Sequence, residues 1–213
     1  MRKKHFRSSI YRRYLMIGRT LLIVVFALLL LGCIYCESVV APFMTQYTVM
    51  KGQQTMTELF NQTVNSKMAE LNLSNDNLMS LTYSNDGKVQ SLNTDVVVLN
   101  KLKGEVTDEL SRLLSEKYEY AVDIPLGSLF KSEFLSGSGK CLRFNNVVTG
   151  DVKSEFRSEF ETGGVNQTIH RLYIDLTGDL LIIGGGEQIP IELTSSVLVG
   201  ETVLVGNVPT VVK

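Results

Sequence analysis

The sequence predicts an α+β protein in which a single N-terminal transmembrane helix precedes a helix-plus-antiparallel-sheet domain outside the cytoplasm. Three observations predict it. An uncharged apolar run covers residues 20–36, and apolar residues recur every three or four positions in two segments between residues 37 and 114. The C-terminal half then alternates apolar and polar residues in long runs separated by glycine-containing turns. Helices followed by sequential strands with short connections are typical of α+β domains with antiparallel sheets.

The apolar run is predicted to be a membrane anchor. As a helix, its length would be about 26 Å, close to the roughly 30 Å core of a bilayer. Residues 1–19 form a basic tail with seven Lys and Arg and no Asp or Glu. Because Lys and Arg beside a span stay in the cytoplasm, we expect this tail inside and residues 37–213 outside. The expected partner of residues 20–36 is therefore the membrane, in a single-pass arrangement.

Three alternatives to a permanent anchor exist. The densest apolar part, residues 21–31, suits the apolar region of a cleaved secretory signal. Leu30-Leu31-Gly32-Cys33 loosely resembles a bacterial lipobox, which would place a lipid on Cys33. The third alternative, a buried core helix, fits poorly beside so asymmetric a charge distribution. The sequence leaves cleavage and lipidation open.

Charge and residue inventory narrow the function classes. The part of the chain after the anchor has fourteen Lys and Arg against twenty-two Asp and Glu, a net charge of −8, which argues against nucleic-acid binding. It holds one histidine, His170, and one cysteine, Cys141, too few for a Cys/His zinc site. Glu155 and Glu159 fall on the polar face of a predicted strand, and the 184–186 turn lacks the Lys of a phosphate loop. We therefore expect no enzyme activity and no cofactor.

Residues 37–76 are predicted to form an amphipathic helical stalk. One apolar stripe runs along it, formed by Met56, Leu59, Phe60, Val64, Met68 and Leu71. Such a stripe must be covered, either by the chain's own distal domain or by a neighbouring copy of the chain. Packing on the distal domain, residues 77–213, is the simpler expectation.

A hairpin and a second helix follow the stalk. The hairpin strands, residues 78–84 and 88–92, flank Asn85-Asp86-Gly87, whose residues tolerate positive φ. Asn93-Thr94-Asp95 then supplies helix-capping side chains. The apolar stripe of the second helix consists of Val98, Leu102, Val106, Leu110, Leu113 and Leu114. Gly104 within it costs about 1 kcal/mol relative to Ala.

The remaining residues are predicted to be strands. Alternation begins at Tyr118 and stops at Pro125, and residues 126–134 form a short helical turn. The longest strand follows, with Val148, Gly150, Val152, Ser154, Phe156, Ser158 and Phe160 on one face. Two further strands, 169–183 and 189–199, complete an antiparallel sheet. Near Leu180 to Ile183 both faces of the middle strand are apolar, so the pattern does not decide which face is buried.

Several strings in this region resemble a known family. They are YAVDIPLGSL (120–129), VNQTIHRLYIDL (165–176) and GETVLVGNVP (200–209), and NTDVVVLNKLKGEVTDEL (93–110) fits with them. Together they resemble the YunB family of sporulation proteins from endospore-forming Firmicutes. The resemblance implies a membrane-anchored protein of endospore formation, in the mother cell or outer forespore membrane. It implies no particular biochemical activity.

The candidate site is a polar cluster at the entry to a strand, after two glycines: Asn166, Gln167, Thr168, His170 and Arg171. These side chains offer donors for an anionic group or a partner strand. In the alternative interpretation, Asn166 and Thr168 close a turn while His170 and Arg171 flank a sheet edge. We expect a structural or assembly role, with copies of itself or other sporulation proteins as partners. The alternative function is a ligand-binding module for cell-wall or lipid head-group material.

Overall fold

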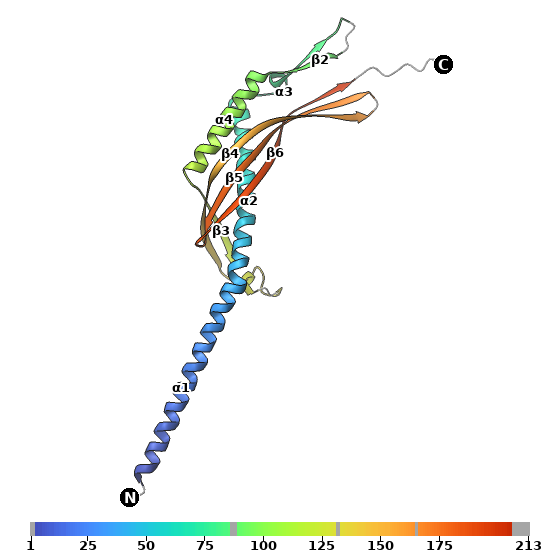
Figure 1. Cartoon of the computed structure of the whole chain (residues 1–213). Helices are drawn as coiled ribbons and strands as arrows, with labels where there is room; N and C mark the ends of the chain where they lie inside the picture. The colour runs from blue at the N-terminus through green and yellow to red at the C-terminus, as the bar shows by residue number, and fades with distance from the viewer. Residues whose placement is uncertain (1–2, 86–88, 131–132, 165, 206–213) are drawn as a thin grey trace, which may run out of the picture. The chain divides into compact units, whose positions relative to one another are not determined.

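The computed structural model describes residues 3–85, 89–130, 133–164 and 166–205 (Figure 1). By their internal contacts these residues form two units, 1–47 with 124–142, and 48–123 with 143–213. The predicted fold class is confirmed, because a long apolar N-terminal helix precedes helices and antiparallel sheets. Of the predicted hairpin turn, Asp86 and Gly87 lie outside the described residues.

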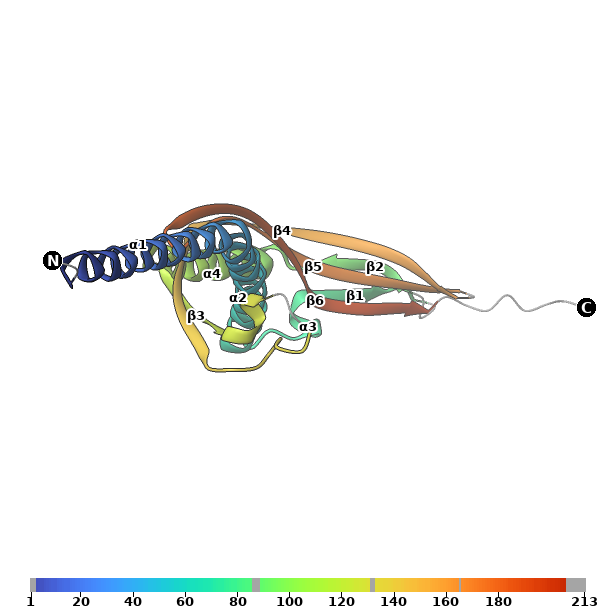
Figure 2. The ribbon, with the colours of Figure 1, turned by 90° about the horizontal axis from the view of Figure 1, so that it is seen from below.

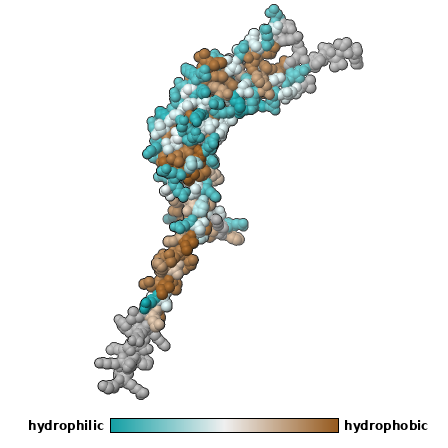
Figure 3. Space-filling model, in the orientation of Figure 1, coloured by the Kyte–Doolittle hydropathy of each residue, from teal (hydrophilic) through white to brown (hydrophobic). Residues whose placement is uncertain are grey.

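The first unit contains an apolar helix whose surface is uncovered. Helix α1 spans Lys3–Tyr35, and a π-helical turn at Cys36–Val40 leads into α2, Ala41–Glu70. Figure 3 shows apolar surface along α1, and none of its most apolar 18-residue window is buried. This helix is long and apolar enough to cross a membrane. A core helix would bury its apolar side chains, so the buried-helix alternative does not fit.

The second unit places helices on a four-stranded sheet with the order β3-β4-β5-β6, and adds a separate β1-β2 hairpin. The pairs β4–β5 and β5–β6 are antiparallel, as predicted. Because β6 comes last in the order, it forms one edge of the sheet. The elements are α3 (Asn75–Leu78), β1 (Met79–Tyr83), β2 (Val89–Thr94), α4 (Val96–Ser115), β3 (Tyr118–Pro125), β4 (Cys141–Gly164), β5 (Gln167–Gly184) and β6 (Glu187–Val205).

The predicted stripe of α2 packs on the sheet of its own chain. Met56, Phe60 and Val64 are fully buried. The Phe60 ring lies against β5 at Gly178, where an added Cβ would come within 3.0 Å of it. The same helix approaches β5 closely at Gly52. Leu59, Met68 and Leu71 are only partly covered, so the buried stripe is narrower than predicted.

Helix α4 begins at the predicted cap. The Asp95 carboxylate accepts hydrogen bonds from the backbone N–H groups of Val97 and Val98, at 3.0 and 3.1 Å. Its buried residues are Leu99, Leu102, Val106, Leu110 and Leu114. Leu99 therefore replaces the predicted Val98 at the start of the stripe, and Leu113 is only partly covered. A 2.6 Å hydrogen bond joins Thr107 of α4 to Ser154 of β4.

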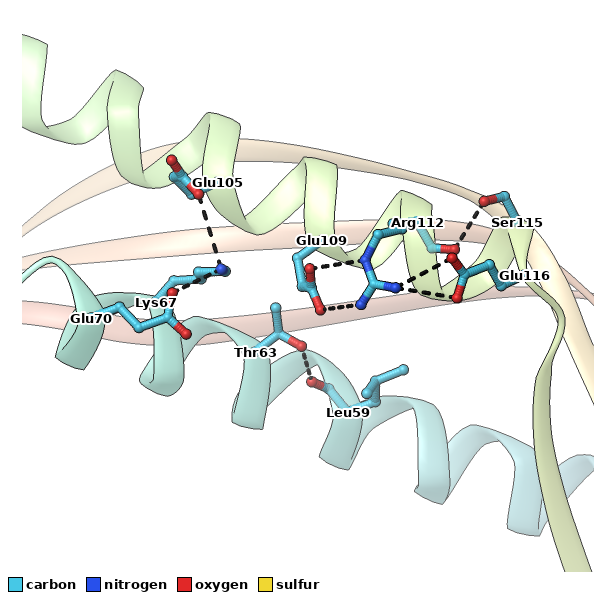
Figure 4. Close-up of polar contacts among 9 residues, drawn as sticks. All are labelled: Leu59, Thr63, Lys67, Glu70, Glu105, Glu109, Arg112, Ser115 and Glu116. Atoms are coloured by element: carbon cyan, nitrogen blue, oxygen red, sulfur yellow. Dashed lines mark hydrogen bonds and ion pairs between the residues drawn. The ribbon is translucent and has the colours of Figure 1, made fainter.

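Charged side chains line the exposed border between α2 and α4 (Figure 4). Lys67 of α2 donates to Glu70 at 2.8 Å and lies 4.0 Å from Glu105 of α4. The hydrogen bond to Glu70 raises the pKa of Lys67 above its ordinary value. On α4, Arg112 joins Glu109 and Glu116. These partly exposed pairs contribute little stability each, and the apolar stripes hold the two helices in place.

The middle strand β5 shows which face of the sheet is covered. Its even-numbered residues from His170 to Ile182 are buried, whereas its odd-numbered residues are partly exposed. Phe60 contacts this face at Gly178 of β5. Thr107 contacts the same face at Ser154 of β4, which pairs with Leu176 of β5. Figure 2 agrees, since α2 and α4 lie on the same side of the curved sheet. The ambiguity near Leu180 to Ile183 is thereby resolved.

Candidate functional site

The five predicted site residues do not converge on one point. Asn166 adopts a positive φ of 61° in the β4–β5 connection, and Gln167 and Thr168 are exposed at the start of β5. His170 and Arg171 are neighbours on a strand, so their side chains point to opposite faces of the sheet. Because β5 lies between β4 and β6, neither residue is at a sheet edge, contrary to the alternative interpretation.

His170 is a buried structural group. It is 2% exposed, its Nδ1 lies 3.2 Å from the Met79 sulfur, and its Nε2 lies 2.6 Å from the Ser158 hydroxyl. A thioether can only accept a hydrogen bond, so Nδ1 carries the proton and Nε2 accepts from Ser158. The Phe160 ring covers the imidazole, with ring centroids 4.5 Å apart. Burial lowers the pKa of His170, which favours the neutral form.

Arg171 is held by two carboxylates on neighbouring strands. Its Nε donates to Glu201 of β6 at 2.7 Å, and its Nη1 donates to Glu161 of β4 at 2.5 Å. These hydrogen bonds raise the pKa of Arg171. The three side chains form a row of alternating charge across β4, β5 and β6. With two carboxylates already bound, Arg171 is a poor receptor for an anionic ligand.

A groove of about 490 Å³ lies between β1 and the end of β6. Figure 2 shows these two strands beside each other. Its lining residues are Asn75, Met79, Ser80, Leu81, Tyr83, Glu201, Thr202 and Val203. His170 contacts one of them directly, because its Nδ1 reaches the Met79 sulfur. Sequence reasoning missed this groove because it joins residues far apart in the chain.

The edge of β6 faces this groove with its backbone. Asn75 bonds both backbone groups of Glu201: its Oδ1 accepts from the N–H at 3.1 Å, and its Nδ2 donates to the carbonyl oxygen. The N–H and C=O of Glu201 therefore point away from β5. In an antiparallel ladder this direction alternates from residue to residue, so the backbone groups of Val203 and Val205 point the same way. The register with β5 is regular over this segment.

A group of side chains that could hold a metal ion would be a second kind of candidate site. Within residues 3–85, 89–130, 133–164 and 166–205, no group of three or more His, Cys, Asp or Glu side chains is arranged to hold a metal ion. The three cysteines are exposed and unpaired by disulfides. The arrangement at the groove is suited to backbone recognition.

Fold and groove thus define a class: an α+β domain that follows an apolar N-terminal helix and places the edge strand β6 beside a polar groove. Residues 121–211 match the family described as Sporulation protein YunB, a stretch that includes the end of β3 and all of β4, β5 and β6. This match confirms the resemblance predicted from the sequence and supports a role in sporulation. Comparison with curated proteins found no match, and comparison with solved structures found none either.

Proposed function

We propose that this chain is a membrane-anchored structural or assembly protein of endospore formation, acting at the mother cell or outer forespore membrane. In this proposal α1 crosses the membrane with its basic tail in the cytoplasm, and residues 37–213 lie outside. The domain has no enzymatic role and needs no cofactor. It works by receiving a strand from another sporulation protein at the edge of β6.

The open edge of β6 is the observation that carries this proposal. Strand edges present unpaired N–H and C=O groups that recruit an additional strand, and proteins commonly blunt such edges. Here Asn75 satisfies the backbone at Glu201, and the groove that both residues line continues along the edge at Thr202 and Val203.

The charge pattern indicates the chemistry of the partner. The row Glu161, Arg171, Glu201 ends in a carboxylate at the sheet edge. Opposite charges across adjacent strands are favourable, so the incoming strand is expected to carry Lys or Arg near Glu201. Residues 187–205 contain three Glu and no Lys or Arg, so pairing with β6 of a second copy would supply no such cation. We therefore infer an extended segment of a different protein, apolar on one face and cationic on the other.

A proline at the outward-facing position tests this proposal. Val203→Pro removes the N–H that faces the groove and leaves the bonds to β5 intact, because proline is tolerated at the open side of an edge strand. Val203→Ala is the matched control, since it keeps the N–H. Each variant would replace the wild-type gene in an endospore former, and heat-resistant spores and crosslinked partners would be measured. We expect the proline variant to lose both, and the alanine variant to keep both.

Two outcomes would count against the proposal. Full sporulation by a folded Val203→Pro variant would show that the edge is not used. Crosslinks only to another copy of the same chain would replace the hetero-partner with self-association. Thermal unfolding of the purified variants, compared with wild type, separates loss of a partner from loss of the fold.

The alternative function, a module for cell-wall or lipid head-group material, uses the cluster from Asn166 to Arg171. Burial of His170 and the two carboxylates on Arg171 weaken that alternative. Its test is direct. Replacing both residues with glutamine, which keeps hydrogen-bonding capacity, should leave sporulation intact if the cluster binds no ligand.

A further inference from the structure

The segment that follows β3 carries four exposed apolar side chains in the first unit. They are Leu126, Phe130, Phe134 and Leu135, here called the interface patch, and their exposed fractions are 38%, 58%, 97% and 47%. Scattered exposed leucines are ordinary in soluble proteins, but two exposed phenylalanines and two leucines within ten residues are not. Exposed apolar side chains gathered in this way indicate a surface that contacts a membrane or another protein.

A hydrogen bond places the patch beside the end of the apolar helix. The Tyr35 hydroxyl donates to the carbonyl oxygen of Leu129 at 3.1 Å, and Tyr35 is the last residue of α1. Leu129 belongs to the 3-10 turn Leu126–Phe130, so the patch starts within the bonded element. Tyrosine is enriched where transmembrane helices leave the hydrocarbon region. The patch therefore lies at the depth at which α1, if it crosses a membrane, emerges from it.

The backbone around the patch is held in a defined shape. Leu126 N–H donates to the Lys140 carbonyl at 3.0 Å, and Gly127 N–H donates to the Ser138 carbonyl at 2.9 Å. A side chain at position 127 would collide with the carbonyl of Leu135. The start of the patch is thus fixed by backbone hydrogen bonds, and its four apolar side chains remain exposed.

We propose that the interface patch inserts into the lipid head-group region next to α1 and forms a second membrane contact. Phenylalanine and leucine side chains on an otherwise polar segment partition to the boundary between head groups and acyl chains. Lipid is favoured over a protein partner because the segment that carries the patch is hydrogen-bonded to Tyr35, at the end of the exposed apolar helix α1. Two contacts would stop the first unit from rotating about the axis of α1. This inference rests on the proposed membrane anchor.

The absence of tryptophan from the sequence allows a site-specific test. Full-length protein with Phe134→Trp would be reconstituted into phosphatidylcholine/phosphatidylglycerol vesicles whose acyl chains carry bromine either near the head groups or near the chain ends. We expect its emission to shift to shorter wavelength and to be quenched more by the shallow bromines. Phe26→Trp in α1 should be quenched more by the deep bromines. Tyr83→Trp, at an exposed position of β1, should be quenched by neither.

The three variants separate the possible failures. Water-like, unquenched emission from Phe134→Trp, together with deep quenching of Phe26→Trp, would overturn the interface patch and leave the anchor standing. Unquenched emission from Phe26→Trp would instead contradict the anchor itself. Phe130→Trp provides a second probe of the patch. The thermal unfolding curve of each variant is compared with that of the wild-type protein, and matching curves show that the substitution has not altered the fold.

Discussion

Asn75 and Glu201 lie 126 positions apart in the sequence and are joined by a pair of hydrogen bonds, through which a side-chain amide takes the place of a missing neighbouring strand. The contact ties α3, and with it the β1-β2 hairpin, to the edge of β6. Both residues also line the groove, together with Thr202 and Val203 of β6.

Replacing Asn75 with Ala is expected to destabilise the domain. Two backbone groups of Glu201 lose their partner, and each lost hydrogen bond costs on the order of 1 kcal/mol. Urea unfolding of the full-length protein in detergent micelles would measure the change. Asn93→Ala serves as the control, since the Asn93 side chain makes 3.2 Å contacts to Thr82 and Ser91 within the exposed hairpin. Equal stability of the two variants would contradict the importance of the Asn75 pair.

Two helical glycines are expected to respond in opposite directions to alanine. An added Cβ at Gly52 would lie 2.5 Å from the Ile182 Cδ1 atom and 2.8 Å from the Tyr120 hydroxyl, so these buried side chains or α2 would have to shift. At Gly104 of α4 nothing lies within 4 Å. Gly104→Ala should therefore stabilise by about 1 kcal/mol through helix propensity, whereas Gly52→Ala should destabilise. Thermal unfolding of both variants checks the signs, and a stabilised Gly52→Ala would disprove the close approach.

Phenylalanine truncation should separate the core from the surface. Phe60 is fully buried between α2 and β5, so Phe60→Ala is expected to cost about 3–5 kcal/mol. Phe134 is 97% exposed within the protein, so Phe134→Ala should lower the free energy of unfolding far less than Phe60→Ala does. Denaturant midpoints of the two variants test the difference. A comparable loss at Phe134 would mean that its side chain is covered by protein.

Stability should fall as the pH is lowered through the titration range of histidine. Burial lowers the pKa of folded His170, so the unfolded chain takes up the proton first and is favoured as the pH drops from about 8 to about 5.5. The groups around the ring, Met79, Ser158 and Phe160, carry no charge in this range. His170→Gln should flatten the dependence of urea midpoint on pH. An unchanged slope in that variant would assign the effect to another group.

The pH interval matters for this comparison. The pKa values of Asp123 and Asp175 are lowered by hydrogen bonds from Arg143 and Arg157. A lowered carboxyl pKa contributes stability that is lost only as the pH falls toward the folded-state pKa, below the ordinary carboxyl range near 4. Measurements above about pH 5.5 therefore isolate the histidine contribution.

Local patterns in the sequence determined the elements of this protein. The uncharged run predicted the apolar helix, the three- and four-residue spacing predicted α2 and α4, and the Asp95 cap set where α4 begins. Alternation predicted three long strands in antiparallel order. The sequence could predict these elements because each signal depends on residues that are close together in the chain. Family motifs in the same strands indicated sporulation.

Only the tertiary structure decided what those elements bring together. The sequence placed His170 and Arg171 in one cluster, but a pleated strand sends neighbours to opposite faces, so one became buried and the other paired with Glu161 and Glu201. The Asn75–Glu201 pair and the Tyr35–Leu129 bond each join residues distant in the chain. The edge position of Val203 likewise depends on the order of strands in the sheet. No local periodicity encodes such contacts, because they arise from the packing of whole elements.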